Sequence, residues 1–90
     1  MTHAVMKFGG TSVKNPARLR AVAHHIANRR QNGTRIVAVV SAMGATTDDL
    51  LALAAELSDR PRPRELDLLM ATGECAAASL LCIALEALGV

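Results

Sequence analysis

Two apolar runs and several stretches with helical periodicity divide the chain. The first run, Ala4 to Phe8, is short, and the second, "RIVAVVS" from Arg35 to Ser41, is continuous and β-branched. A continuous apolar run of this kind is typical of a strand buried on both faces of a parallel sheet. Because a helical stretch separates the two runs, the pattern predicts a βαβ unit with parallel strands, and the fold class is α/β.

The helix between the two strands is expected to run from Asn15 to Gly33. Asn15 is a good N-cap, Pro16 suits the first helical position, and Gly33 suits the position after the helix end. The helical spacing places four apolar residues on one face, namely Leu19, Val22, Ala23 and Ile26.

The second half of the chain is predicted to be mostly helical. "GATTDDLLALAAEL" predicts a helix capped by Thr46 or Thr47, and the pattern is helical again from Glu65 onward. We expect Gly73 to break this last stretch into two helices, with Thr72 as the cap of the second. One face of the final helix consists of Leu80, Ile83, Ala84 and Ala87.

Composition limits the chain to one small domain with more apolar surface than such a domain needs. It has 90 residues, 51% of them are hydrophobic, and Phe8 is the only aromatic residue. A domain this short buries a modest fraction of its surface. The excess predicts an oligomer, or faces that a further stretch of polypeptide covers.

Charge and cysteine usage argue against several other classes of protein. A net charge of +2 without interleaved aromatic residues argues against nucleic acid binding. We find no signal peptide, and Glu74 and Glu86 interrupt the longest apolar helical stretch, so we expect no membrane span and a cytoplasmic location. Cys75 and Cys82 are expected to be free, buried thiols. No metal site is predicted, because the three histidines lack acidic or cysteine partners at ligand spacing.

The loop after the first strand carries candidate chemistry. In "KFGGTSV", Lys7 provides a positive charge, and Gly9 and Gly10 allow a ligand to approach the backbone closely. Thr11 and Ser12 add hydroxyl donors, and successive backbone N–H groups in such a turn form an anion-binding nest. The loop therefore suits a phosphate. A tight strand-to-helix turn beside a surface lysine explains the same residues without a ligand.

The loop after the second strand is built in a similar way. Ser41 ends the strand, Gly44 follows, and Thr46 and Thr47 come before a helix. Ligands of open α/β sheets bind at the carboxyl ends of the strands, so both loops are expected at one binding edge. Helix capping accounts equally well for the threonines. Glu74 is expected in the first turn of the last helix, where it either contacts a ligand or complements the helix dipole.

Three stretches together resemble the N-terminal part of the aspartate kinases, which belong to the amino acid kinase family: "KFGGTSV", "VVSAMGATTDDLL" and "RELDLLMATGE". The resemblance covers the chain from Val5 to its end, with the motifs in family order. It implies a partial amino acid kinase fold, an incomplete three-layer αβα sandwich. It also implies that ATP with Mg²⁺ phosphorylates the β-carboxylate of L-aspartate to 4-phospho-aspartate, the first step of lysine, threonine and methionine biosynthesis.

The resemblance also assigns roles to individual residues. Lys7 matches the cation that neutralises charge on the transferred phosphoryl group. The loop that binds the ATP phosphates is matched by Lys7, Phe8, Gly9, Gly10, Thr11 and Ser12. The positions close to the reacting groups and to aspartate are matched by Ser41, Thr47 and Glu74.

The enzymes of this family are several times longer than 90 residues. The resemblance therefore implies that residues 1–90 are the N-terminal part of a catalytic domain, without its nucleotide-binding half and its regulatory domains. We expect no kinase activity from these residues alone. The alternative is a non-catalytic, truncated fragment that docks on a full-length kinase.

Overall fold

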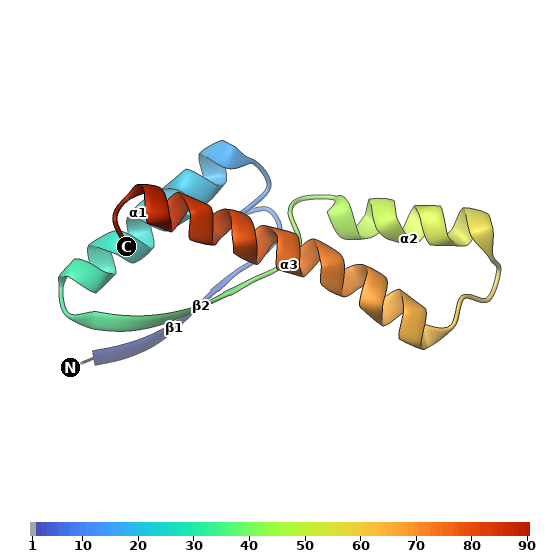
Figure 1. The fold of residues 1–90 in the computed structure, drawn as a ribbon, viewed down its shortest axis with the longest axis horizontal. Helices are drawn as coiled ribbons and strands as arrows, with labels where there is room; N and C mark the ends of the chain where they lie inside the picture. The colour runs from blue at the N-terminus through green and yellow to red at the C-terminus, as the bar shows by residue number, and fades with distance from the viewer. Residues whose placement is uncertain (1) are drawn as a thin grey trace.

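Residues 2–90 form a two-stranded parallel sheet and three helices in the computed structural model (Figure 1). Thr2 lies opposite Thr34 and Phe8 lies opposite Val40 in the strand register. The parallel pairing across a helix confirms the predicted βαβ unit. In chain order the elements are β1 (Thr2–Phe8), α1 (Pro16–Gln31), β2 (Thr34–Val40), α2 (Thr46–Leu57) and α3 (Pro63–Ala87).

Helix α1 begins and ends where the sequence predicts. The side chain of Asn15 accepts a hydrogen bond from the backbone N–H of Arg18 at 2.9 Å, and Pro16 occupies the first helical position. Gly33 follows the C-cap with a φ of 85°, which is in the left-handed region that favours glycine. These boundaries depend on contacts within three or four residues, so the local sequence suffices to predict them.

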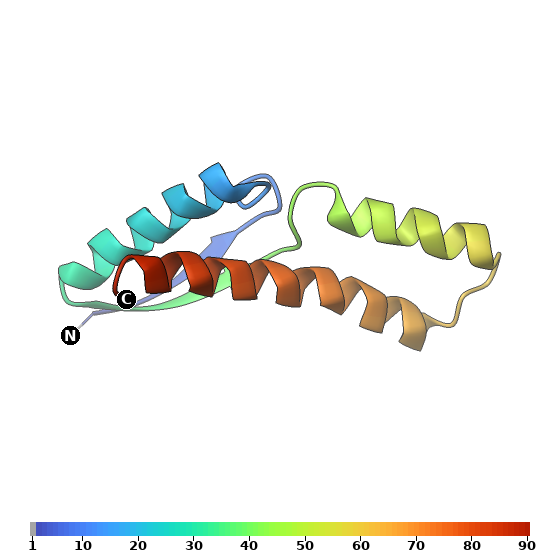
Figure 2. The same cartoon turned by 45° about the horizontal axis from the view of Figure 1, so that its top comes forward.

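The core lies between the sheet and two helices, α1 and α3, which pack side by side over the same face (Figure 2). The four predicted residues of α1 are all buried, together with Val13 and Leu81. The strand residues packed against this cluster are Met6, Phe8, Ile36, Ala38 and Val40.

The opposite face of the sheet is uncovered within residues 2–90. We call it the open face; its apolar residues are Val5, Val37 and Val39, with exposed fractions of 74%, 62% and 45%. The prediction that the second strand is buried on both faces is therefore wrong for these residues, because helices cover only one face. An uncovered face is what the incomplete three-layer sandwich implies.

Helix α3 is a single helix, so the predicted break at Gly73 and the predicted cap at Thr72 are wrong. The Thr72 hydroxyl donates to the carbonyl oxygen of Leu69 inside the helix at 2.6 Å. Alanine and leucine on both sides of Gly73 favour the helix, and one interior glycine costs only about 1 kcal/mol. Helix propensity therefore outweighs the glycine.

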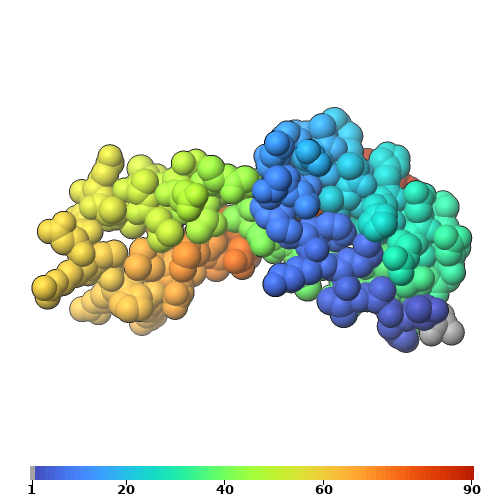
Figure 3. Space-filling model, turned by 180° about the vertical axis from the view of Figure 1, so that it is seen from behind, coloured from blue at the N-terminus to red at the C-terminus, as the bar shows by residue number. Residues whose placement is uncertain are grey.

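Helix α2 packs along the first half of α3, and the two form an arm that extends away from the sheet (Figures 1 and 3). The chain measures 50 × 25 × 18 Å, and its radius of gyration is 15.4 Å. A compact chain of this length has a radius of about 12 Å. The predicted threonine cap of α2 is wrong, because Ala45 is the N-cap and the N–H of Thr46 donates to Met43.

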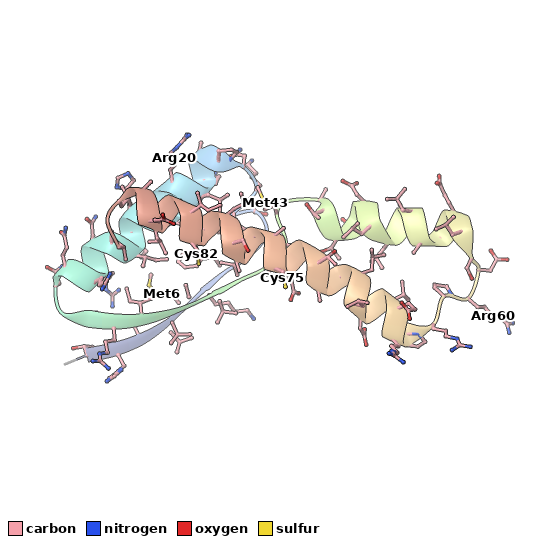
Figure 4. All side chains as sticks on the ribbon, viewed as in Figure 1. Met6, Arg20, Met43, Arg60, Cys75 and Cys82 are labelled. Carbon is pink, nitrogen blue, oxygen red and sulfur yellow. The ribbon has the colours of Figure 1, made fainter. Side chains whose placement is uncertain are left out.

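Helix α3 is apolar around most of its circumference. By length and composition it could cross a membrane, with a mean hydropathy of 1.9 over 18 residues, of which 17% are buried. Glu74 and Glu86 therefore do not by themselves exclude such a helix, and the expectation of no membrane span stays a prediction. The core helix of a larger α/β domain has the same character. Cys75 and Cys82 are free as predicted, but both are exposed rather than buried (Figure 4).

Candidate functional site

The loops that follow β1 and β2 meet at the carboxyl ends of the two strands, as predicted. The N–H of Ser41 donates to the carbonyl oxygen of Phe8 at 3.1 Å. The N–H of Gly44 donates to the carbonyl oxygen of Gly10 at 3.0 Å, and Gly44 has a φ of 49°. Two hydrogen bonds therefore join segments more than thirty residues apart in the sequence.

The first loop begins with a tight helical turn. Ser12 donates its N–H to Gly9 at 3.0 Å, and Val13 donates to Gly10 at 3.3 Å. The side chain of Val13 is fully buried and anchors the turn in the core. Within residues 2–90, the N–H groups of Gly9, Gly10 and Thr11 make no hydrogen bond. Three consecutive donors therefore remain for an anion at the start of the turn.

The two glycines of this loop serve different purposes. A Cβ on Gly10 would lie 2.8 Å from the carbonyl oxygen of Ala42, whereas a Cβ on Gly9 would meet nothing within 4 Å. Neither glycine has a positive φ. Gly10 is therefore required by the packing of one loop on the other, and only Gly9 leaves space for a ligand. The successive free N–H groups of this turn are the arrangement that the prediction of an anion-binding nest describes.

Strand alternation separates Lys7 from Phe8. Lys7 is exposed and lies on the same side of β1 as Val5, which belongs to the open face. Phe8 packs against the core on the opposite side, and its carbonyl oxygen accepts from Ser41. Lys14, at the far end of the loop, is a second exposed lysine that the sequence analysis missed. The Cβ of Lys14 lies 3.4 Å from the Cβ position of Gly44. In the sequence, only its place directly before the N-cap Asn15 indicates that it lies near this loop.

The middle of α3 packs against the second loop. Gly73 is buried, and its Cβ position lies 3.1 Å from the Cβ of Ala42 and 3.3 Å from Cγ2 of Thr46. Thr47 follows Thr46 in the chain, and Glu74 follows Gly73. Thr47 and Glu74, the two predicted aspartate contacts, are therefore each adjacent in sequence to a residue of this helix contact.

The position of Glu74 differs from the prediction. It lies in the middle of α3, not in a first helical turn, and it is exposed. The helix dipole acts on charges in the first and last turns only. Complementarity with the helix dipole therefore does not explain Glu74. Of the two interpretations given above, contact with a ligand is the one that stays a prediction.

The candidate site is an edge and not an enclosed cavity. The residues of the candidate site line none of the three hollows found along the sheet and α3. The most apolar of these hollows lies between α1 and α3, beside Arg20 and His24. Within residues 2–90, no three His, Cys, Asp or Glu side chains gather as a metal site.

Comparisons with known proteins agree with this geometry. The sequence model described as the amino acid kinase family matches residues 3–90. An aspartokinase of Thermus thermophilus is 50% identical over 90 residues, which is all of this chain and 22% of the relative. Aspartokinase 2 of Bacillus subtilis is 47% identical over 85 residues, or 94% of this chain and 21% of the relative.

A solved structure shows the same arrangement. The crystal structure of aspartate kinase from Synechocystis matches with a TM-score of 0.94 and 45% identity, over 98% of this chain and 15% of that chain. The chain spans about a fifth of the length of the curated relatives it matches.

Proposed function

The chain belongs to the amino acid kinase family, and on that premise we propose that it forms the phosphate- and aspartate-binding part of an aspartate kinase catalytic domain. Residues 1–90 would be its N-terminal part, and the nucleotide-binding half and any regulatory domains would lie outside them. The reaction transfers the γ-phosphoryl group of ATP to the β-carboxylate of L-aspartate and gives 4-phospho-aspartate. This product leads to lysine, threonine and methionine, and the enzyme would work in the cytoplasm.

The single observation that carries the proposal is the hydrogen-bonded junction of the two loops beside three free N–H groups. Within residues 2–90, the N–H groups of Gly9, Gly10 and Thr11 donate to no acceptor. Lys7 is the penultimate residue of the adjacent strand, and the hydroxyl of Ser12 belongs to the same turn. An edge with clustered donors and a cation suits the phosphates of ATP.

Phosphoryl transfer fits such a site because it depends mostly on positioning and on stabilisation of charge. In this proposal Lys7 neutralises charge on the transferred group, and Ser41 lies close to the reacting atoms. Phe8 acts through its backbone and its place in the core, because its side chain does not reach the loop edge. The attacking β-carboxylate of aspartate is already ionised near neutral pH, so no strong general base is needed.

Mg²⁺ would arrive as a complex with ATP. It usually keeps several waters and is bound by substrate phosphates and one or two carboxylates. The metal would supply further neutralisation of the phosphate charge.

Glu74 and Thr47 are assigned to aspartate. A carboxylate beside the phosphates of ATP would repel them, so Glu74 is better paired with the α-ammonium group of the substrate. Thr47 contributes a hydroxyl from the first turn of α2. Thr47 and Glu74 each follow directly a residue of the contact between Thr46 and Gly73, which supports their assignment to one small ligand.

Isothermal titration of the 90-residue chain with Mg·ATP and then with aspartate tests the proposal. We expect weak binding of Mg·ATP that Lys7→Ala abolishes and that Lys14→Ala, a change in the other lysine near the loop, reduces less. Equal losses in the two variants would refute the specific role of Lys7. Circular dichroism of each variant controls for folding, and a folded wild-type chain without binding would count against a preformed phosphate site.

A non-catalytic fragment remains the second candidate, and the open face favours it. Val5, Val37 and Val39 are exposed on one uncovered side of the sheet, which is typical of a surface that other polypeptide covers. In this case the chain would associate with a kinase polypeptide and would bind neither substrate alone. The same titration distinguishes the two functions.

A further inference from the structure

We propose that Gly73 is a positioning residue, which sets the separation of Thr47 and Glu74 through its contact with Ala42. This inference rests on the proposed function for the identity of the ligand, an α-amino dicarboxylic acid. Gly73 lies in the interior of α3 with no positive φ, so the backbone conformation does not require glycine. Because glycine is unfavourable in a helix interior, its presence here calls for a spatial reason.

The spatial reason is the close approach of α3 to the second loop. The Cβ position of Gly73 lies 3.1 Å from the Cβ of Ala42, 3.3 Å from Cγ2 of Thr46 and 3.8 Å from Cδ1 of Leu50. The first two distances are shorter than ordinary van der Waals contact. A methyl group at position 73 would therefore push α3 and the loop apart by a few tenths of an ångström.

Ala42 connects this contact to the phosphate loop. Ala42 is 4% exposed, and it lies close to both Gly10 and Gly73. Its carbonyl oxygen lies 2.8 Å from the Cβ position of Gly10, and its methyl group lies 3.1 Å from that of Gly73. The three residues form a continuous series of close contacts from the first loop to α3. An added carbon atom would clash with a backbone oxygen at Gly10 and would require a shift of a few tenths of an ångström at Gly73.

This packing determines the geometry of the proposed aspartate contacts. Thr47 and Glu74 are each one residue from the contact between Thr46 and Gly73, so a shift of α3 changes their separation directly. The free N–H groups lie on the first loop and Lys7 lies in β1 just before it, so both are separated from α3 by the contact between Ala42 and Gly10. An added methyl group at position 73 should therefore affect aspartate more than Mg·ATP.

The experiment is a rescue series measured by amide NMR spectra and by titration with aspartate and with Mg·ATP. Gly73→Ala should displace the amide resonances from Ala42 to Thr47. A weakened charge-assisted contact between Glu74 and the substrate should reduce aspartate affinity about tenfold, with Mg·ATP affinity changed about twofold at most. Adding Ala42→Gly to Gly73→Ala removes the methyl group that is 3.1 Å away and should restore both the resonances and the aspartate affinity.

The matched control uses the other glycine. Ala42→Gly should not rescue Gly10→Ala, because the atom that opposes Gly10 is the backbone oxygen of residue 42, which glycine retains. Unchanged aspartate affinity in Gly73→Ala, or no rescue by Ala42→Gly, would overturn the inference. A general loss of stability would not produce a rescue that works at position 73 and fails at position 10.

Failure of the proposed function gives a different result. A wild-type chain that is folded and binds neither ligand would refute the proposed function. The spacing role of Gly73 is then decided by the amide resonances alone: reversal by Ala42→Gly supports it, and absence of reversal overturns it.

Discussion

The adjacent glycines of the first loop provide the sharpest test of the structure, because the same substitution is expected to have opposite effects. A Cβ on Gly10 would lie 2.8 Å from the carbonyl oxygen of Ala42, about 0.6 Å inside ordinary contact, which begins at 3.4 Å. A Cβ on Gly9 would lie in open space. Neither glycine has a positive φ, so alanine is not excluded by the backbone conformation at either position.

The expected magnitudes follow from these distances. Overpacking of this kind costs about 1–3 kcal/mol. Movement of Gly10 would also weaken its hydrogen bond from Gly44, which is worth about 1 kcal/mol. Gly10→Ala should therefore reduce the free energy of unfolding by about 2–3 kcal/mol. Gly9→Ala should raise it by about 0.4–1 kcal/mol, because alanine reduces the conformational freedom of the unfolded chain.

Urea unfolding followed by far-UV circular dichroism measures both variants against the wild-type chain, at two protein concentrations to detect association. Small domains lose about 1–3 kcal/mol of stability per molar urea, so a loss of 2–3 kcal/mol moves the midpoint by about 1 M or more. Equal midpoints for the two variants, or a lower midpoint for Gly9→Ala, would refute the reasoning. If Gly10→Ala leaves no folded baseline, faster hydrogen exchange at the Gly44 amide in partially folded protein would report the lost contact.

Three further predictions concern the helix cap, the substrate site and the open face. Asn15→Ala removes the acceptor of the Arg18 N–H and should lower the free energy of unfolding by about 1 kcal/mol, measured by urea unfolding; no change would mean that another group caps α1. In an intact kinase that contains these residues, Glu74→Gln should raise the KM for aspartate far more than the KM for ATP, and equal increases would argue against pairing with the substrate ammonium. Val37→Lys adds charge to the open face and should reduce concentration-dependent association in sedimentation velocity, whereas Arg29→Lys, on the exposed side of α1, should leave association unchanged. Association that persists in Val37→Lys would show that another surface is responsible.

The apolar surfaces of these 90 residues have a common explanation. The sheet is covered on one face only, and α3 is apolar on sides that no element within residues 2–90 contacts. Sheets with two strands and open edges are marginally stable by themselves. The high apolar content therefore fits a segment of a larger domain, in agreement with relatives about five times as long.

The sequence by itself determined the features that depend on near neighbours in the chain. Asn15, Pro16 and Gly33 determine the ends of α1 through contacts and conformations within a few residues. The order of strand, helix and strand determined that both glycine-bearing loops lie at one edge, because parallel strands share their carboxyl ends. The candidate phosphate loop was predictable for the same reason.

Only the tertiary structure decided the features that depend on residues far apart in the sequence. Nothing near Gly73 shows that Ala42 lies 3.1 Å from its Cβ position, so a buried helix glycine was mistaken for a helix break. Gly9 and Gly10 are equivalent in the sequence, and the oxygen of Ala42 alone distinguishes them. The exposure of Val37 and of Cys82 likewise depends on which elements cover them, because burial is a property of neighbours in space and not of composition.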